Sequence, residues 1–460
     1  MYGRLRKVHF IGIGGSGMSG LAEVLLNLGY VVSGSDARTS ETTDRLRRMG
    51  GRIFIGHDAH HVEGAQAVVY STAIADANPE LQAARELGLP VIPRAELLAE
   101  LMRMKFGVAV AGAHGKTTTT TLIGSVLGRG GLDPTVVVGG RVHAFGSHAR
   151  LGQGQFLVAE ADESDGSFLR LTPAIAVITN LDLEHVDHYG GMEAIRQAFV
   201  AFASRVPFYG LVIACAEDTE AQAALAALAS KRTMTYGFHS GDVRARDVEI
   251  TASGSRFTVH YGDRRVGAVE TKLVGRHNVL NSLAAVCVGL ELEISFPLIR
   301  DGLAEFQGVG RRFEVKGEVD GILVVDDYGH HPTEIRATLA AAKVHGRRLV
   351  VVFQPHRYTR THALAERFGE AFDDADVVFV TDVYAAGEAP IPGASAERIV
   401  QAARAHGHAS VEAAGDLASA EARVAAVLVP GDLLLTLGAG DVWKLAERFV
   451  RARSASGERT

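Results

Sequence analysis

Cysteine is almost absent from this chain of 460 residues, which contains only Cys215 and Cys287. Two cysteines do not make a disulfide framework, so a reducing compartment, the cytoplasm, is expected. The sequence also lacks any apolar run of the 18 or more residues that would span a bilayer. The first residues, MYGRLRKVHFIGIGG, lack the continuous apolar core of a secretory signal peptide. We therefore expect a cytoplasmic globular protein without a membrane span.

An excess of positive charge is missing as well. Lys and Arg number 47 against 53 Asp and Glu, a formal net charge of −6. Generic nucleic-acid binding needs a basic face, so no nucleic-acid partner is expected. The sequence shows no repeat of solenoid period and no low-complexity segment. Any anionic ligand must therefore be met by local positive charge.

Short apolar stretches alternate with helical stretches along nearly the whole chain, a pattern typical of parallel α/β domains. The chain is too long for one hydrophobic core, and the pattern restarts at residue 106 and at residue 313. We predict an α/β protein of three domains. They are a Rossmann-like N-terminal domain (1–105), a central P-loop ATPase-like domain (106–312) and a C-terminal Rossmann-like α/β domain (313–460).

A first glycine-rich turn, FIGIGGSGMSG, follows a predicted strand and precedes a predicted helix. Gly12, Gly14 and Gly17 form G-x-G-x-x-G, which places a pyrophosphate on the amides of a helix N-terminus. Asp36 ends the next predicted strand, where a dinucleotide-binding fold keeps a ribose-binding acid. The alternative is a tight turn whose glycines serve packing alone.

A second loop, GAHGKTTT, gives a more specific signal. Gly112 and Gly115 precede Lys116 and Thr117, so the loop offers backbone amides, an ammonium for the outer phosphates and a hydroxyl for Mg²⁺. The spacing, G-x-x-G-K-T, is shorter than the usual P-loop. The agreement of strand, loop, Lys-Thr pair and helix favours a nucleoside triphosphate.

Two further predicted strands end in polar residues in the central part. The strand FLVAE delivers Glu160 to its carboxyl end, and carboxylate oxygens suit Mg²⁺. For the acidic residues that follow, Asp162, Glu163 and Asp165, a solvated surface loop explains the pattern at least as well. The segment NLDLEHVDHYG follows the other strand, and His185 is its predicted metal or substrate residue.

The remaining polar clusters lie in or after the helix that begins near residue 276. His277, Asn278 and Asn281 share one helix face, and capping does not explain all three. Arg311 and Arg312 are equally consistent with a phosphate clamp and with solvent exposure.

Two strand ends in the last domain carry titratable and cationic groups. These are Asp326, Asp327, Tyr328, His330 and His331 after the first strand, and His356, Arg357 and Arg360 after the second. Zinc is an alternative, but the adjacent arginines and the lack of cysteine favour anion recognition.

Together these segments resemble the Mur ligase family, including its short form of the phosphate loop. The segments that carry the resemblance, between residues 12 and 361, are GIGGSGMSG, GAHGKTTT, EADESDGSF, NLDLEHVDHYG, HNVLNSLAA, GRRFE, DDYGHHPTE and FQPHRYTRT. The resemblance implies ATP and Mg²⁺ as cofactors and UDP-N-acetylmuramate and L-alanine as substrates, joined through an acyl phosphate in peptidoglycan precursor synthesis. A monomer or homodimer is expected. The two glycine loops then serve two phosphorylated substrates.

The resemblance also implies residue roles. The ATP site would contain Gly112, Ala113, His114, Gly115, Lys116, Thr117, Thr118, His277, Asn278, Asn281, Arg312 and Asp327. The metal ligands would be Thr117, Glu160 and His185. The substrate site would contain Gly14, Gly15, Ser16, Gly17, Met18, Asp36, Ser71, Thr72, Tyr328, His330, His356, Arg357 and Arg360. Catalysis would fall to Lys116, His185, Glu160, His330 and Arg357, and either His330 or His356 would accept the proton of the amine.

Several sister ligases of this family hold a second Mg²⁺ with a carbamylated lysine after the segment that matches NLDLEHVDHYG. Here that stretch reads GGMEAIRQAFVAFASRV, and no lysine occurs between Lys116 and Lys231. Arg196 is no substitute, because a guanidinium stays protonated. We expect any second metal to depend on carboxylates, His185 or the phosphates.

Three other functions are compatible with part of the sequence. A ligase that reattaches a salvaged tripeptide to UDP-N-acetylmuramate shares the fold, although GIGGSGM and DDYGHHPTE look more like the alanine-adding form. A nicotinamide-dependent oxidoreductase would use Gly12, Gly14, Gly17 and Asp36 but leaves Lys116 without a role. A nucleotide-binding switch would not require the polar strand ends of the last domain.

Overall fold

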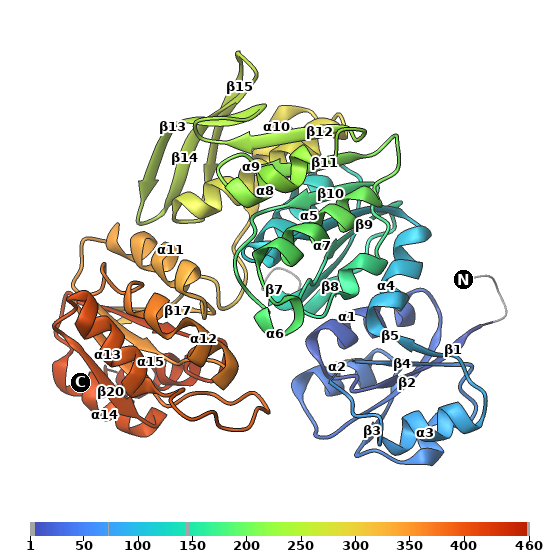
Figure 1. Ribbon diagram of the computed structural model, residues 1–460, viewed down its shortest axis with the longest axis horizontal. Helices are drawn as coiled ribbons and strands as arrows, with labels where there is room; N and C mark the ends of the chain where they lie inside the picture. The colour runs from blue at the N-terminus through green and yellow to red at the C-terminus, as the bar shows by residue number, and fades with distance from the viewer. Residues whose placement is uncertain (1–4, 72, 143–146, 458–460) are drawn as a thin grey trace. The chain divides into compact units, whose positions relative to one another are not determined.

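The computed structural model describes residues 5–71, 73–142 and 147–457, and its strands form three sheets (Figure 1). The chain divides into two compact units. The first comprises residues 1–248, 256–271 and 278–307, and the second comprises residues 249–255, 272–277 and 308–460. The predicted α/β class with three domains is confirmed, and the domain boundaries at 105/106 and 312/313 stay predictions.

The first sheet has five parallel strands in the order β3-β2-β1-β4-β5. Its strands are β1 (Lys7–Ile11), β2 (Val31–Asp36), β3 (Arg52–Ile55), β4 (Ala67–Tyr70) and β5 (Val91–Pro93). Its helices are α1 (Ser16–Asn27), α2 (Glu41–Arg48), η1 (Ala59–Val62), α3 (Pro79–Glu86) and α4 (Arg94–Arg103). The strand order reverses at β1, so the carboxyl end of β1 is the place where such sheets bind ligands.

The second sheet has ten strands in the order β15-β14-β13-β12-β11-β10-β6-β9-β7-β8. The strands are β6 (Phe106–Ala111), β7 (Thr135–Val142), β8 (Ser147–Arg150), β9 (Phe156–Glu160), β10 (Ile175–Ile178), β11 (Leu211–Cys215), β12 (Thr233–Gly237), β13 (Val243–Thr251), β14 (Gly254–Tyr261) and β15 (Arg264–Thr271). The helices are α5 (Lys116–Arg129), η2 (Ser167–Arg170), α6 (Val186–Tyr189), α7 (Met192–Ser204), α8 (Thr219–Ala226), α9 (Arg276–Glu291) and α10 (Phe296–Glu305). Because β6 pairs in parallel with both β9 and β10, the segments that follow these three strands meet at one edge.

The third sheet, in the order β16-β17-β21-β18-β19-β20, is parallel except for the edge strand β16. Its strands are β16 (Glu314–Val319), β17 (Ile322–Asp327), β18 (Leu349–Phe353), β19 (Val377–Thr381), β20 (Val411–Gly415) and β21 (Leu433–Leu437). Its helices are α11 (Pro332–Lys343), α12 (Tyr358–Gly369), α13 (Ala396–His406), α14 (Leu417–Val427) and α15 (Trp443–Gly457).

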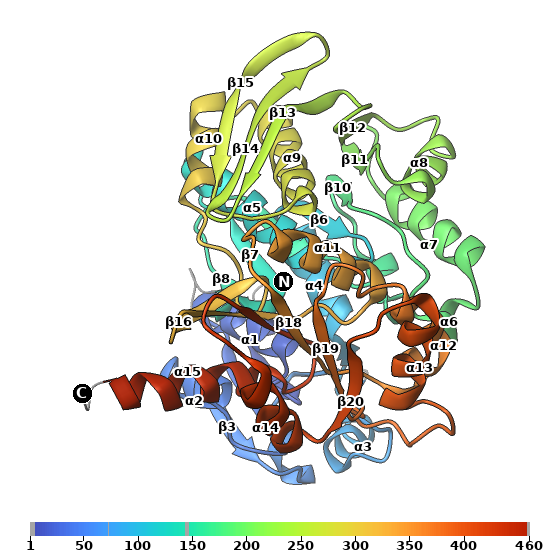
Figure 2. The same cartoon turned by 90° about the vertical axis from the view of Figure 1, so that its left-hand side faces the viewer.

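Buried aliphatic and aromatic side chains explain why these elements stack in layers. In the third sheet, helices α11, α12 and α13 cover one face, and helices α14 and α15 cover the other (Figures 1 and 2). The central strands of this sheet are buried on both faces, which is why they read as continuous runs such as LVVVF and LLLTL.

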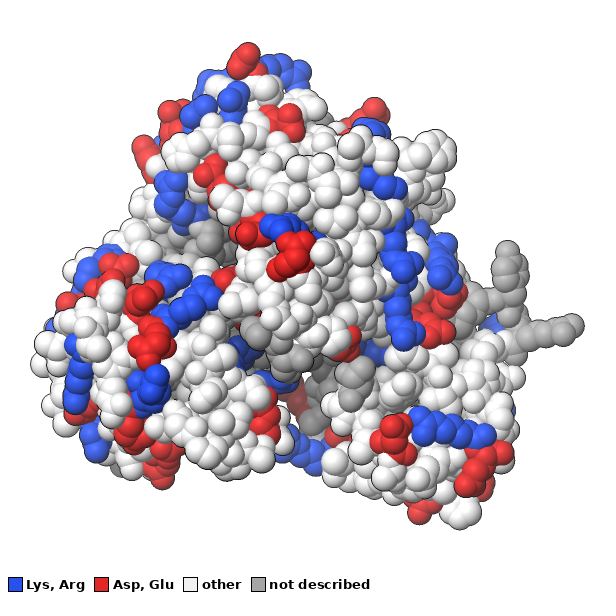
Figure 3. Space-filling model, in the orientation of Figure 1, with Lys and Arg blue, Asp and Glu red and all other residues white. Residues whose placement is uncertain are grey.

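Charged side chains of both signs are interspersed over the face shown in Figure 3. Among the described residues, no helix has both the length and the apolar character needed to cross a bilayer. Both cysteines are free thiols and buried.

Candidate functional site

The first glycine-rich loop is fastened to the end of β2. The amides of Gly12 and Ile13 both donate to the carbonyl of Ser35 at 2.9 Å. The amide of Gly14 donates to Oδ2 of Asp36 at 2.9 Å, so this carboxylate holds the loop itself. Gly12 has a φ of +77°, a conformation that favours glycine.

Helix α1 begins directly after this loop with Gly15 as its N-cap, and among the described residues no side chain caps it. The helix N-terminus therefore offers backbone amides to an anion, as the sequence predicts. Gly17 and the buried Met18 lie in the first turn of α1, and Ser71 directly follows β4. Nothing is described of the Ser16 side chain, and Thr72 lies outside the described residues.

Arg94, at the start of α4, is a cation at this loop that the motifs did not single out. A Cβ on Gly17 would lie 2.8 Å from Nη1 of Arg94, so the guanidinium covers the first turn of α1. Nη2 of Arg94 also lies 3.7 Å from Oδ2 of Asp162, in the loop after β9. No local pattern marks Arg94, because the contact depends on how α4 packs beside α1.

The second loop connects β6 to α5 and needs glycine at two positions. Gly112 has a φ of +138°, and a Cβ there would lie 2.0 Å from Oγ1 of Thr179. Gly115 has a φ of +81°, and a Cβ there would lie 2.6 Å from Oδ1 of Asn281. Both conformations favour glycine, and the predicted loop therefore forms between β6 and α5.

The ammonium of Lys116 is enclosed by oxygen atoms. Nζ donates to the carbonyls of Gly112 at 2.5 Å and Ala113 at 3.1 Å, and to Oε1 of Glu163 at 2.9 Å. Burial alone would lower the pKa of Lys116, but the charges of Glu163 and Asp162 outweigh burial and raise it. Lys116 therefore stays charged at neutral pH.

Residues of the neighbouring strand end hold His114, the middle residue of the same loop. Its amide donates to Oδ1 of Asn180 at 2.9 Å, and its carbonyl accepts from Nδ2 of Asn180 at 3.0 Å. Nε2 of His114 lies 3.2 Å from Oδ2 of Asp182. Asn180 and Asp182 follow β10, so two predicted segments do meet in the fold.

An acidic cluster lies beside Lys116. One ligand atom each from Glu163, Glu184 and His185 lie within 4.8 Å of one another. Nε2 of His185 is 3.8 Å from Oε1 of Glu163 and 3.8 Å from Oε2 of Glu184. His185 has a φ of +52°, an uncommon conformation for a residue other than glycine and one that recurs at functional sites.

The chemistry of this donor set suits a divalent cation. Burial raises the pKa of Glu163 to about 7, although Lys116 acts in the opposite direction. A buried carboxylate with such a pKa lacks full compensation for its charge, and a hard cation beside it would supply that compensation. Carboxylate oxygens and one imidazole nitrogen are ligand types that such an ion accepts.

Glu163 is the residue that sequence analysis passed over. Its acidic surroundings in the sequence are at least as consistent with a solvated loop, yet Glu163 is only 3% exposed. Glu160, the predicted ligand at the end of β9, instead accepts the amide of Gly139 on Oε2 at 2.8 Å. Its predicted role in metal binding stays a prediction.

Helix α9 brings its asparagines to the second loop. Oγ1 of Thr119 donates to Oδ1 of Asn281 at 3.1 Å, and Nδ2 of Asn281 donates to Oδ1 of Asn278 at 3.1 Å. Both asparagines are buried, as are Thr117 and Thr118 in the first turn of α5. Two residues of the polar helix face predicted from sequence, Asn278 and Asn281, therefore lie beside the second loop and the start of α5.

In the second unit, the paired arginines contact carboxylates and one aromatic ring. Nε of Arg311 donates to Oδ2 of Asp326 at 3.1 Å, and Nη1 of Arg312 donates to Oε1 of Glu334 at 3.3 Å. The ring of Tyr328 lies 5.0 Å from Cζ of Arg311 and 5.1 Å from Cζ of Arg312. The side chains of Arg311 and Arg312 are 22% and 28% exposed, and the choice between a phosphate clamp and solvent exposure stays open.

Asp327 and His277 are also constrained by their neighbours. Asp327 accepts the amides of Gly329 and Phe313, both at 2.7 Å. Burial, followed by the charge of Arg312, lowers the pKa of His277 to about 4. His277 is therefore neutral at pH 7.

The ends of β17 and β18 bring a second group of aromatic and cationic residues together. The ring centroids of His330 and His356 are 5.8 Å apart, and Tyr384 stacks on His356 at 5.6 Å. Nη1 of Arg360 lies 3.4 Å from Nδ1 of His356, and the amide of Arg357 donates to the carbonyl of Tyr384 at 2.9 Å. Tyr384 follows β19, and no motif singled it out.

Charge distinguishes this group from the acidic cluster. Burial, then the cations Arg360 and Arg357, lower the pKa of His356 to about 4, so this imidazole is neutral and a weak base at pH 7. The side chain of Arg357 is 47% exposed and 4.0 Å from Glu388. The group therefore offers guanidinium charge to a small anion.

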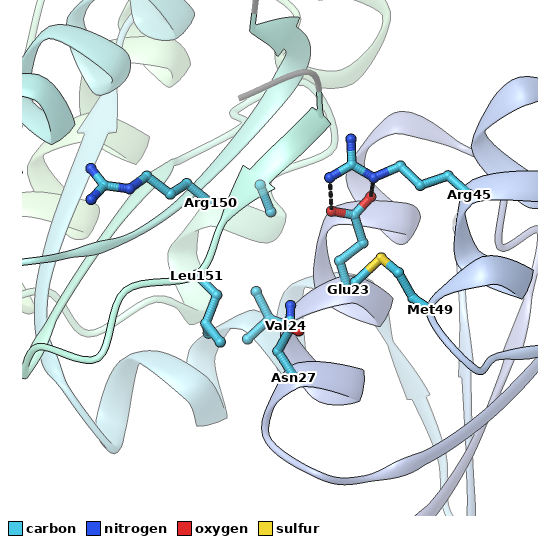
Figure 4. Close-up of a pocket in the computed structure, with 8 residues that line it drawn as sticks. Glu23, Val24, Asn27, Arg45, Met49, Arg150 and Leu151 are labelled. Carbon is cyan, nitrogen blue, oxygen red and sulfur yellow. Dashed lines mark hydrogen bonds and ion pairs between the residues drawn. The ribbon is translucent and has the colours of Figure 1, made fainter. Parts of the chain in front are cut away.

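A pocket of about 580 Å³ lies away from both glycine loops, where α1 packs near β8 (Figure 4). Glu23 and Arg45 pair with each other on one wall, with two contacts of 3.2 and 3.3 Å. Arg150, at its opposite wall, pairs with Asp133 at 2.9 Å. Because these charges are already paired, the pocket is a weaker candidate for an anion than the loops.

Comparison with protein families and known proteins gives one consistent answer. The catalytic domain of the Mur ligase family matches residues 7–106, the Mur ligase middle domain matches residues 110–289, and the Mur ligase glutamate ligase domain matches residues 311–440. The chain is 54% identical over 461 residues to UDP-N-acetylmuramate–L-alanine ligase of Geobacter sp. (strain M21), and the match covers the whole of both chains. The same enzyme of Geobacter sulfurreducens is 54% identical, with 98% of each chain covered.

Solved structures show the same relation. UDP-N-acetylmuramate-alanine ligase from Thermotoga maritima aligns with a TM-score of 0.83 at 30% identity, covering 98% of this chain and 99% of that one. A murein peptide ligase from Psychrobacter arcticus aligns with a TM-score of 0.73 at 25% identity, covering 97% and 98%.

Proposed function

The chain belongs to the Mur ligase family, and we propose that it joins L-alanine to the carboxylate of UDP-N-acetylmuramate in an ATP-dependent reaction of peptidoglycan precursor synthesis. The identity of 54% over the full length to ligases of that name supports this choice of substrates. The more distant similarity to a murein peptide ligase, at 25%, gives the tripeptide-salvage reaction less support.

Each domain would hold one substrate. The first glycine loop and α1, in residues 1–105, would take the diphosphate of the UDP sugar on backbone amides. The second loop and α9, in residues 106–312, would take ATP, with Asn278 and Asn281 against the loop. The cationic group around His356, in residues 313–460, would take L-alanine, with a guanidinium of Arg357 or Arg360 on its carboxylate.

In the first step, the sugar carboxylate attacks the γ-phosphorus of ATP, the bond to ADP breaks, and an acyl phosphate forms. The step brings two anions together, so positioning and positive charge must supply most of the catalysis. Lys116, already charged and enclosed in the second loop, would move its ammonium from Glu163 to the transferring phosphoryl group. That Lys116 contact is the observation that carries the proposal, because it places a charged loop lysine beside the candidate cation ligands.

Mg²⁺ fits the donor set around this lysine, and when bound it would neutralise phosphate charge. Thr117, Glu160 and His185 would hold the ion, and the position of Glu163 adds a fourth candidate ligand. These residues would also fix the orientation of the phosphates relative to α5.

In the second step, the amine of L-alanine attacks the carbonyl carbon of the acyl phosphate. The tetrahedral intermediate then expels phosphate and leaves the amide. The amine must lose a proton, and His330 is the candidate we favour, because His356 with a pKa of about 4 is a weak base. Nδ1 of His330 lies 3.0 Å from the carbonyl of Tyr328, which fixes the orientation of the ring.

Measuring phosphate release tests the proposed ligase activity directly. Purified protein with ATP, Mg²⁺, UDP-N-acetylmuramate and L-alanine should release phosphate and form UDP-N-acetylmuramoyl-L-alanine, and omission of any one component should stop the reaction. Replacing L-alanine by the tripeptide tests the salvage reaction in the same assay. Turnover with the tripeptide but not with L-alanine would overturn the proposed substrate.

A further inference from the structure

A buried carboxylate lies next to the first glycine loop without belonging to any motif. Glu80, the second residue of α3, is fully buried, and four side chains surround its carboxylate. Oε2 accepts from Oγ of Ser35 at 2.5 Å and lies 3.2 Å from Nδ1 of His57. Oε1 lies 2.6 Å from Nδ1 of His61 and 3.9 Å from Nε2 of His9.

The surroundings keep Glu80 ionised. Burial alone would raise its pKa, but the contacts with His9, Ser35, His61 and His57 outweigh burial and lower the pKa to about 2. An ionised carboxylate only accepts hydrogen bonds, so it matches the Ser35 hydroxyl and the N–H groups of the imidazoles.

Ser35 connects this carboxylate to the loop. Its side chain binds Glu80, while its carbonyl accepts the amides of both Gly12 and Ile13. The next residue, Asp36, accepts the amide of Gly14. The last two residues of β2, Ser35 and Asp36, therefore accept three successive loop amides. Glu80 holds Ser35 through a hydrogen bond to its side chain.

The segment that follows β3 also contacts Ser35 and Asp36 at the end of β2. The amide of Gly56 donates to the carbonyl of Asp36 at 2.9 Å, and Nδ1 of His57 lies 3.1 Å from Oγ of Ser35. His61, in η1, stacks on Phe54 of β3 with a centroid separation of 4.1 Å. Glu80 thus joins β2, the segment after β3 and α3 at one buried point.

We propose that Glu80 is a positioning residue for the UDP-sugar site, acting through Ser35 on the amides of the first glycine loop. This inference rests on the proposed function, because it assumes that the loop receives the diphosphate of UDP-N-acetylmuramate. Glu80 does not touch the substrate. It holds the strand end that sets where the loop amides lie, so its loss weakens binding of the UDP sugar selectively.

Glu80→Gln is the first test, because it keeps the shape and removes the charge. An amide has one acceptor oxygen, and its NH₂ group would face the donors that now bind the carboxylate. Hydrogen bonds to a charged group are stronger than those between neutral groups, so we expect the KM for UDP-N-acetylmuramate to rise about tenfold or more. The KM values for ATP and L-alanine should stay at wild-type values.

Ser35→Ala is the second test, and it removes only one hydroxyl, so it addresses the same link with less disturbance of the core. Ser35→Ala should also raise the KM for UDP-N-acetylmuramate. In the double variant, Glu80→Gln with Ser35→Ala, the change in binding free energy should be smaller than the sum of the two single changes, because both substitutions act through one contact. Glu86→Gln, at the exposed end of α3, is the matched control and should leave all three KM values unchanged.

The outcomes separate the two proposals. If the wild-type protein turns over and both Glu80→Gln and Ser35→Ala keep the wild-type KM for the UDP sugar, the positioning role is overturned. A parallel rise of all three KM values also overturns it, since that pattern indicates general damage. If the wild-type protein does not turn over with UDP-N-acetylmuramate and L-alanine, the proposed function fails, and the role of Glu80 falls with it.

Discussion

Lys116 carries its positive charge inside the second loop, where two carbonyls and Glu163 surround the ammonium. We predict that Lys116→Ala lowers kcat on the order of 10²- to 10³-fold, because the lost charge acts mainly as the γ-phosphoryl group transfers. Phosphate release under saturating substrates measures this. Lys343→Ala, on the exposed end of α11, is the control. Activity of Lys116→Ala within a few-fold of wild type would contradict the assignment of the loop.

Arg357 and Arg360 belong to the cationic group around His356. We predict that Arg357→Ala and Arg360→Ala each raise the KM for L-alanine much more than the KM for ATP. Arg→Lys at either position should also weaken L-alanine binding, because a point ammonium does not reproduce a planar bidentate fork. The measurement is a set of three KM values for each variant.

Arg398→Ala is the matched control for these variants, since Arg398 is exposed on α13 and pairs with Glu366. Equal effects on all three substrates would instead indicate structural damage or a contact with phosphate. Such a result would remove the amino-acid role from these arginines.

The composition of helix α7 bears on whether a carbamylated lysine can serve as a metal ligand. It contains no lysine, and its one arginine, Arg196, pairs with Glu193 and with Glu220. A carbamylated lysine is therefore absent from this helix. We predict equal activity in buffers with and without carbon dioxide and bicarbonate. A loss of activity on bicarbonate removal that is reversed by adding it back would contradict this prediction.

The segments after β9 and β10 supply the candidate cation ligands. We predict that Glu160→Ala and Glu163→Gln each weaken the apparent affinity for Mg²⁺, because each removes a hard anionic oxygen. Titration of activity with Mg²⁺ at saturating ATP gives the midpoint for each variant. Glu193→Gln, exposed on α7, is the control. An unchanged midpoint for Glu160→Ala would leave Glu163 as the better-supported ligand.

At the scale of the whole molecule, buried ionisable groups link folding to pH. The folded-state pKa of His277 is about 4, below its usual value of 6.5, so folding favours the neutral imidazole. A depressed histidine pKa contributes stability that is complete above pH 6.5 and is lost as the pH falls from 6.5 toward 4, because the unfolded chain then binds the proton. We predict that the wild-type protein loses stability relative to His277→Gln over this range.

Urea unfolding at pH 7.5 and pH 5, compared between the wild-type protein and His277→Gln, measures this difference. Comparing the two proteins at each pH cancels the contributions of the other titrating groups, among them Glu163. A difference between the two midpoints that does not change with pH would contradict the role given to His277.

The elements and loops that sequence analysis predicted share a local cause. A glycine at φ +138° or +81°, a Lys-Thr pair and the helix that follows are all specified by neighbours along the chain. The same holds for strands buried on both faces, whose apolar runs are visible without any tertiary information. This is why the α/β class, the two glycine loops and the polar strand ends were predictable.

The contacts that complete the candidate site come from residues far apart in the sequence. Lys116 and Glu163 form a hydrogen bond although they are 47 positions apart in the sequence, and Ser35 and Glu80 do so although they are 45 positions apart. Arg94 and Tyr384 likewise reach their sites from elements that no motif marks. The sequence by itself determined which local pieces form and where their strands end. Only the tertiary structure decided that Glu163 is buried against Lys116 and that Glu80 supports the first loop, because sheet order and helix packing bring those side chains together.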